Sequence, residues 1–217
     1  MPVRVFVAAV TLAMLASACS AGSSVSSPAD PDAISIGFTA EPATLDFTRT
    51  DGAAIPQALL LNVYEGLVRL DADGKIVPLL AREWTVSEDR KTYDFYLWEG
   101  VKFANGQPFG AQDVKFSLDR VKTDWSISLK SKMDVVDRVQ VVSPTHARIT
   151  LKRPSNAWLF DMTTRVGAMF SPSGVADLAN TPVGTGPYVF ANRKRGDSIV
   201  LRANPSYWGK RPTYTTV

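Results

Sequence analysis

Cysteine and histidine are almost absent from this sequence. Among its 217 residues the only cysteine is Cys19 and the only histidine is His146. A single cysteine excludes an intramolecular disulfide. With one residue of each kind, His-rich zinc sites and Cys/His nucleophile pairs are excluded too. We therefore expect no metal site.

The sequence motifs of other enzyme classes are lacking as well. No Gly-x-Ser-x-Gly nucleophile motif occurs. Gly184-Thr185-Gly186 begins like a nucleotide-binding loop, but it runs into Pro187 and lacks the Lys-Ser/Thr pair that such a loop needs. We interpret it as a tight turn before a strand at Tyr188. The sequence therefore predicts a protein with no catalytic residues and no cofactor.

Over most of the chain, neither basic nor acidic residues are in clear excess. The formal net charge is +3, from 24 basic and 21 acidic residues, and opposite charges are interspersed, as in Glu88-Asp89-Arg90-Lys91. Basic residues dominate only in 193–211, which we interpret as a solvated hairpin and its flank. A nucleic-acid partner is therefore not expected. With 45% hydrophobic residues, the composition suits one core, or one core with a subdomain.

The first residues have the pattern of an export signal. Arg4 precedes an uncharged, mostly apolar run from Val5 to Leu15. This run is shorter than the roughly 20 residues of a membrane-spanning helix, which favours a signal peptide over 1–18. The Ser-, Gly- and Pro-rich stretch that follows Cys19 has almost nothing to bury, so 19–32 is expected to be a flexible tether.

The stretch around Cys19 resembles the bacterial lipobox, in which the cysteine is acylated and becomes the new N-terminus. That resemblance implies a lipid anchor on Cys19 at the outer face of the cell membrane. The match departs from the usual pattern because Leu15 lies four positions before the cysteine, and Ala16 occupies the usual place. Ordinary cleavage after Ala18 or Ala21 remains the alternative.

Apolar periodicity predicts both strands and helices. Alternating residues predict strands over 33–39 and 93–97 and hairpins over 139–151 and 188–201. Apolar residues from Ile55 to Leu70 recur at helical spacing, which predicts a helix that breaks into a short strand at 67–69. A second helix is expected to begin near Gly110-Ala111, and Ser155 is expected to cap a short helix through Phe160. Because no regular βαβ order appears, the expected fold class is α+β (mixed α/β).

Several blocks, in this order, resemble the extracellular solute-binding proteins of family 5, which serve peptide- and nickel-type ABC importers. The blocks are 61–68 with Tyr64-Glu65-Gly66-Leu67, then 78–84, 86–95, 98–103, 105–109 and 113–120, and finally Gly184-Thr185-Gly186-Pro187-Tyr188 and Asn204-Pro205-Ser206-Tyr207-Trp208.

The resemblance implies a two-lobe clamshell of the type II, oligopeptide-binding type, of which this chain holds the first lobe and an inserted subdomain. Residues 33–49 would begin the first lobe, 50–164 would form the subdomain and 165–217 would return to the first lobe. The second lobe would be missing, because family members are usually more than twice this length. Backbone at Asp51, Gly52 and Ala53 would contact the ligand; the alternative is that Asp51-Gly52 is simply a turn.

The implied function is the substrate-binding component of an ABC importer. It would capture peptides, or related small solutes, outside the membrane and deliver them to the permease subunits. The alternative is a truncated lipid-anchored remnant with no solute-binding activity.

Overall fold

A computed structural model describes residues 30–217; the expected signal peptide, Cys19 and nearly all of the tether lie outside the described residues. Residues 31–217 form one compact unit. No helix within 30–217 has the length and apolar character needed to cross a bilayer. The elements are α1 (Ala54–Leu59), β1 (Val68–Leu70), β2 (Ile76–Pro78), β3 (Ala81–Val86), β4 (Thr92–Leu97), α2 (Ala111–Thr123), β5 (Val136–Ser143), β6 (His146–Leu151), α3 (Trp158–Asp161), β7 (Tyr188–Lys194) and β8 (Ser198–Ala203).

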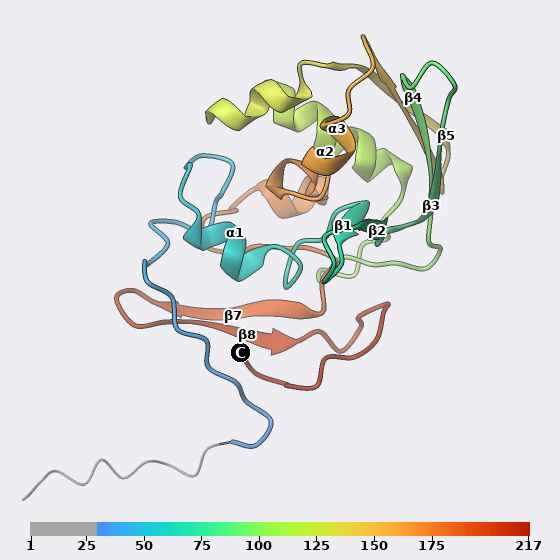
Figure 1. The fold of residues 1–217 in the computed structure, drawn as a ribbon. Helices are drawn as coiled ribbons and strands as arrows, with labels where there is room; N and C mark the ends of the chain where they lie inside the picture. Colours follow the sequence, from blue (N-terminus) through green and yellow to red (C-terminus); the bar gives the residue numbers. More distant parts are fainter. Residues whose placement is uncertain (1–29) are drawn as a thin grey trace, which may run out of the picture. The chain divides into compact units, whose positions relative to one another are not determined.

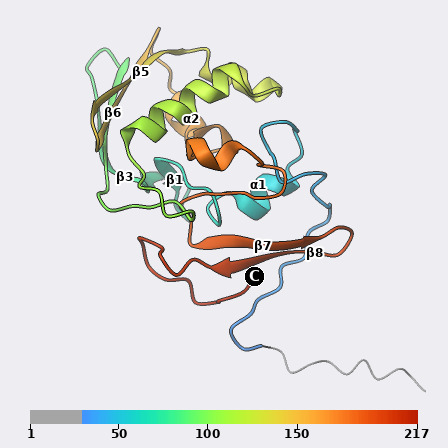
Figure 2. The ribbon, with the colours of Figure 1, turned by 180° about the vertical axis from the view of Figure 1, so that it is seen from behind.

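The largest sheet is antiparallel, in the order β3-β4-β6-β5, and α2 packs across one face of it (Figures 1 and 2). Alternation puts Phe95 of β4 and Ile149 of β6 on the covered face, where both are fully buried. Val114 and Leu118 of α2 are buried as well. The predicted strand over 93–97, the hairpin over 139–151 and the helix starting after Gly110 are thus confirmed.

The long helix predicted from Ile55 is wrong beyond Leu59. Leu61 has a φ of 65°, in the left-handed region, and the chain reverses there. The carbonyl oxygens of Asn62 and Val63 accept bonds from the N–H groups of Tyr188 and Gly186, both at 2.9 Å, so they are not available to continue a helix. The apolar spacing therefore predicted which residues are buried, but not their helical conformation.

The predicted hairpin over 188–201 is β7–β8 (Figure 1). The outer edge of β8 pairs with the last residues of the chain, where Leu201 and Val217 exchange two backbone hydrogen bonds of 2.8 and 2.9 Å. The strand predicted over 33–39 is wrong except for one parallel bridge between Ala33 and Thr216. Beyond that bridge the segment pairs with no other strand of residues 30–217, and Ile36 and Phe38 are 59% and 46% exposed.

An aromatic cluster joins segments distant in sequence inside the core. Phe47 lies edge-on to Tyr64, at 5.3 Å between ring centroids, and to Trp125, at 6.0 Å. Phe170 contacts both Phe47 and Tyr64. The loop that holds Phe47 is thereby fixed on the body of the protein, which matters because it leads directly to the candidate site.

Candidate functional site

The candidate site is the loop that leads from Phe47 to α1. Leu45 and Phe47 are buried and anchor its start. The Asp46 carboxylate accepts hydrogen bonds from the backbone N–H and the hydroxyl of Thr48, at 2.9 and 2.6 Å, which fixes the turn between them. The following residues Asp51, Gly52 and Ala53 are all exposed. An anchored loop therefore presents the three expected ligand-contact residues to solvent.

The side chain of Arg165 binds the backbone of this exposed loop. Its Nη1 donates to the carbonyl oxygens of Thr50, at 2.9 Å, and Gly52, at 3.4 Å, and its Nη2 donates to that of Asp51, at 3.2 Å. Burial lowers the pKa of Arg165, and the charge of Asp51 opposes this shift. Three successive carbonyl groups bound to one planar guanidinium make the loop conformation specific.

Unlike its carbonyl groups, the backbone N–H groups of this loop are mostly without a partner within the described residues. Gly52 donates to Thr50 Oγ1 at 3.3 Å. Among residues 30–217, none accepts a hydrogen bond from the N–H of Asp51 or Ala53. The loop therefore offers two N–H donors, two residues apart, that are not satisfied within the described residues.

The Gly184-Thr185-Gly186 loop packs against backbone. A Cβ atom on Gly184 would lie 1.9 Å from the Val63 carbonyl oxygen, and one on Gly186 would lie 2.3 Å from that of Asn62. Both glycines are therefore needed for close approach to the chain that follows α1. The loop does lead into the strand at Tyr188, as the sequence predicted.

Glu65 joins three of the sequence blocks at one buried carboxylate. It is 1% exposed and accepts hydrogen bonds from the Thr185 hydroxyl (2.9 Å), the Tyr207 hydroxyl (2.8 Å) and the Trp208 indole N–H (2.9 Å). Burial raises the pKa of Glu65, and these three hydrogen bonds oppose the rise. This role of Glu65 was not predicted from the sequence, although an acidic residue within the apolar run from Val63 to Val68 was a signal for it.

The only histidine lies on the other face of the four-stranded sheet from α2. His146 Nε2 is 2.6 Å from Asp94 Oδ1, and Arg148 Nε donates to the same oxygen at 2.8 Å. The ring of His146 stacks on Tyr96 at 4.6 Å. Within 30–217 no group of three or more His, Cys, Asp or Glu side chains is placed to bind a metal ion.

Comparison with known proteins gives consistent matches. The family model of the bacterial extracellular solute-binding proteins, family 5 Middle, matches residues 75–217. The glutathione-binding protein GsiB of Salmonella typhi is 35% identical over 159 residues, covering 71% of this chain and 31% of GsiB. The nickel-binding periplasmic protein of Escherichia coli K12 is 36% identical over 161 residues, covering 69% of this chain and 30% of that protein.

A solved structure agrees with these matches. The ABC transporter-associated periplasmic binding protein DppA of Helicobacter pylori, in complex with peptide STSA, superposes with a TM-score of 0.75 at 25% identity. The match covers 82% of this chain and 40% of that one. The fold is thus the mixed α/β fold of type II periplasmic binding proteins, in part, and the chain spans about a third of the length of the curated relatives it matches. The chain belongs to the bacterial extracellular solute-binding proteins of family 5.

Proposed function

We propose that this chain is part of the substrate-binding component of an ABC importer, and that this component binds peptides outside the membrane. The observation that carries the proposal is the loop at 50–53: Arg165 binds the carbonyl groups of Thr50, Asp51 and Gly52, while the N–H groups of Asp51 and Ala53 have no acceptor among the described residues. Family membership supports the same role, since the relatives are named for binding glutathione, nickel and peptide. The solute would then be delivered to the permease subunits of the importer.

The loop suits an extended peptide in particular. The free N–H groups of Asp51 and Ala53 would donate to carbonyl groups two residues apart in the ligand backbone. Main-chain hydrogen bonds of this kind give affinity that does not depend on the ligand's sequence. In this proposal 33–49 belong to the first lobe, 50–164 to the inserted subdomain and 165–217 to the returning chain. Arg165 would then tie the returning chain to the loop that begins the subdomain.

Replacing Arg165 by alanine is expected to weaken solute binding. Titration calorimetry of the 217-residue chain with a mixture of tri- to pentapeptides should give saturable binding at roughly micromolar concentration. Arg165→Ala should weaken it by about tenfold or more, since freed carbonyl groups let the loop move and add an ordering cost to binding. The measurement is the dissociation constant, with the melting temperature recorded for each variant.

Arg138→Ala is the matched control, because Arg138 is exposed and its side chain bonds, within the described part of the chain, only to Asp137 and Gln140. It should bind like the unaltered chain. Absence of any heat from the folded chain would instead favour the lipid-anchored remnant. If the Arg165→Ala and Arg138→Ala variants bind the peptides with equal affinity, Arg165 does not contribute to the binding site.

We further propose that the chain is exported and anchored by lipid on Cys19. The lipobox-like stretch before Cys19 motivates this, and two or more acyl chains give stable attachment to a membrane. Intact-mass analysis of the membrane fraction is expected to show loss of residues 1–18 and an added mass of acyl chains. A Cys19→Ser variant should no longer be found in the membrane fraction. An unmodified Cys19 in membrane-bound protein would contradict the anchor.

A further inference from the structure

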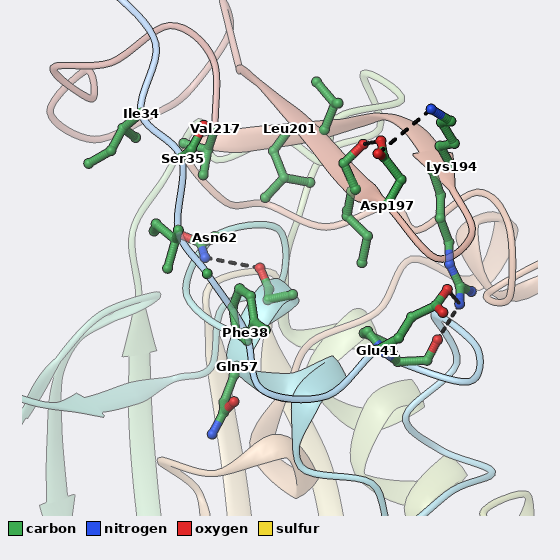
Figure 3. Close-up of a pocket in the computed structure, with 18 of the residues that line it drawn as sticks. Ile34, Ser35, Phe38, Glu41, Gln57, Asn62, Lys194, Asp197, Leu201 and Val217 are labelled. Carbon is green, nitrogen blue, oxygen red and sulfur yellow. Dashed lines mark hydrogen bonds and ion pairs between the residues drawn. The ribbon is translucent and has the colours of Figure 1, made fainter. Parts of the chain in front are cut away.

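Arginines from distant parts of the chain hold both ends of the segment that leads into the candidate site. At its start, Arg193 of β7 forms an ion pair of 3.1 Å with the Glu41 carboxylate (Figure 3) and donates to the Pro42 carbonyl oxygen. At its end, Arg165 binds the carbonyl groups of 50–52. The segment is therefore fixed at two points by cations that come from outside it.

A third arginine, Arg120 of α2, is buried beside the middle of this segment. Its side chain is 8% exposed, and its guanidinium carbon lies 5.5 Å from the centroid of the Phe170 ring, on which Phe47 also packs at 5.8 Å. Just beyond the end of α2, the N–H of Ser126 donates to the Thr48 carbonyl at 3.2 Å. The carboxyl end of α2 therefore contacts the turn that starts the ligand loop.

The direct contacts of Arg120 match its charge only in part. Its Nε lies 3.5 Å from the Asp124 carboxylate, and its Nη1 is buried without a hydrogen-bond partner among residues 30–217. Burial lowers the pKa of Arg120, and the charges of Asp124 and Asp46 oppose this shift. A buried cation needs a nearby negative charge. Of these two carboxylates Asp46 is the less solvated, since its side chain is 15% exposed against 52% for Asp124.

Asp46 links this charge to the ligand loop, because its carboxylate accepts the two hydrogen bonds from Thr48 that fix the turn. Opposite charges attract more strongly where solvent is scarce, so Arg120 favours the mostly buried position of the carboxylate that this turn requires. We propose that Arg120 is a positioning residue of the candidate site: its charge holds the Asp46 carboxylate in place and thereby fixes the turn that leads to the loop at 51–53. The expected effect on affinity rests on the proposed peptide-binding function, whereas the effect on the turn does not.

The test compares Arg120→Met, which removes the charge but keeps a long side chain, with Arg120→Lys, which keeps the charge. Amide hydrogen exchange is measured without peptide at Thr48 and Ser126, whose hydrogen-bonded N–H groups report on the turn, and at Leu151 in the four-stranded sheet. Arg120→Met is expected to speed exchange at Thr48 and Ser126 by roughly tenfold or more relative to Leu151. Arg120→Lys should retain most of the protection, since its ammonium group supplies the same charge.

Asp46→Asn tests whether Arg120 acts through this carboxylate. The amide oxygen can still accept the bonds from Thr48, but the negative charge is removed. In the Asp46→Asn background, Arg120→Met should therefore change exchange at Thr48 little further, because residues that act on each other are not additive. An equally large further increase in that background would overturn the proposal. Faster exchange at Leu151 by the same factor as at Thr48 would overturn it too, since Arg120 would then stabilise the whole fold rather than the turn.

The same variants are titrated with the mixture of tri- to pentapeptides. Arg120→Met should weaken binding by about tenfold, because a turn that moves adds an ordering cost, and Arg120→Lys should weaken it less. Arg138→Met, at an exposed position, is the matched control and should change neither binding nor exchange at Thr48. Unchanged affinity of Arg120→Met would overturn the role of Arg120 in the site. If the unaltered chain binds no peptide, the proposed function fails, while the exchange measurements still decide whether Arg120 holds the turn.

Discussion

Replacing Gly184 by alanine is expected to destabilise the protein by about 3 kcal/mol or more. The added Cβ would lie 1.9 Å from the carbonyl oxygen of Val63 and 2.7 Å from its carbonyl carbon. Both are backbone atoms, and Val63 is held by the bond that its carbonyl accepts from Gly186, so the clash cannot be relieved by a side-chain rotation. For a domain of this size the melting temperature should fall by about 2–4 °C per kcal/mol, which thermal unfolding measures.

Gly37→Ala is the control for this prediction. A Cβ at Gly37 would have no atom within 4 Å, and the backbone there does not require glycine. Its effect is expected to stay within about 0.5 kcal/mol. If the two variants unfold at the same temperature, the close approach of Gly184 to the chain after α1 is not important for stability.

Replacing Glu65 by alanine is expected to cost about 3 kcal/mol or more of the free energy of unfolding. The change leaves the donors of Thr185, Tyr207 and Trp208 without their acceptor, and each buried unsatisfied donor costs about 1–3 kcal/mol. Denaturant unfolding measures the loss. Glu83→Ala is the control, because the Glu83 side chain is exposed and forms an ion pair with Arg82 at 3.6 Å. An equally large loss of unfolding free energy in Glu83→Ala would contradict a specific role for Glu65.

The ionisation of Glu65 also makes stability depend on pH. Burial raises its pKa above the ordinary value of 4.5 despite three opposing hydrogen bonds, so the folded protein takes up this proton more readily than the unfolded chain. Stability from this group should therefore increase as the pH falls from neutral through the raised pKa, and level off below about 4.5. Glu65→Gln removes this titrating group. As the pH falls from neutral to about 4.5, the unfolding free energy of the unaltered chain should therefore rise relative to that of the Glu65→Gln variant. A flat difference would contradict a raised pKa.

Local patterns predicted those elements that bury one regular face of their own residues. The alternation in β4 and the spacing of Val114 and Leu118 in α2 were sufficient, because each pattern matches one buried face. The predicted short helix is α3, but Ala157, not Ser155, is its N-cap residue; Ser155 Oγ accepts the N–H of Trp158 at 3.2 Å from two positions further back. Strand β3 was not predicted, because it lies at the sheet edge with most of its residues exposed and lacks alternation.

The candidate site was less predictable because its contacts are distant in sequence. Asp51, Gly52 and Ala53 came from family resemblance, and the structure places them together on one exposed loop. The residue that holds them, Arg165, follows more than a hundred positions later and shows no spacing relation to them. The same holds for Glu65, whose partner Thr185 lies 120 positions away. Side chains that act across such separations are found only once the chain is folded.

Amide hydrogen exchange at Asp51 and Ala53 tests the central claim most directly. If this loop binds peptide backbone through its free N–H groups, saturating tri- to pentapeptide mixture should slow exchange at both amides. Exchange at exposed residues far from the site, such as Glu83, should not change. Unchanged exchange at Asp51 and Ala53 while calorimetry shows peptide bound would contradict the account and place the ligand elsewhere on the chain.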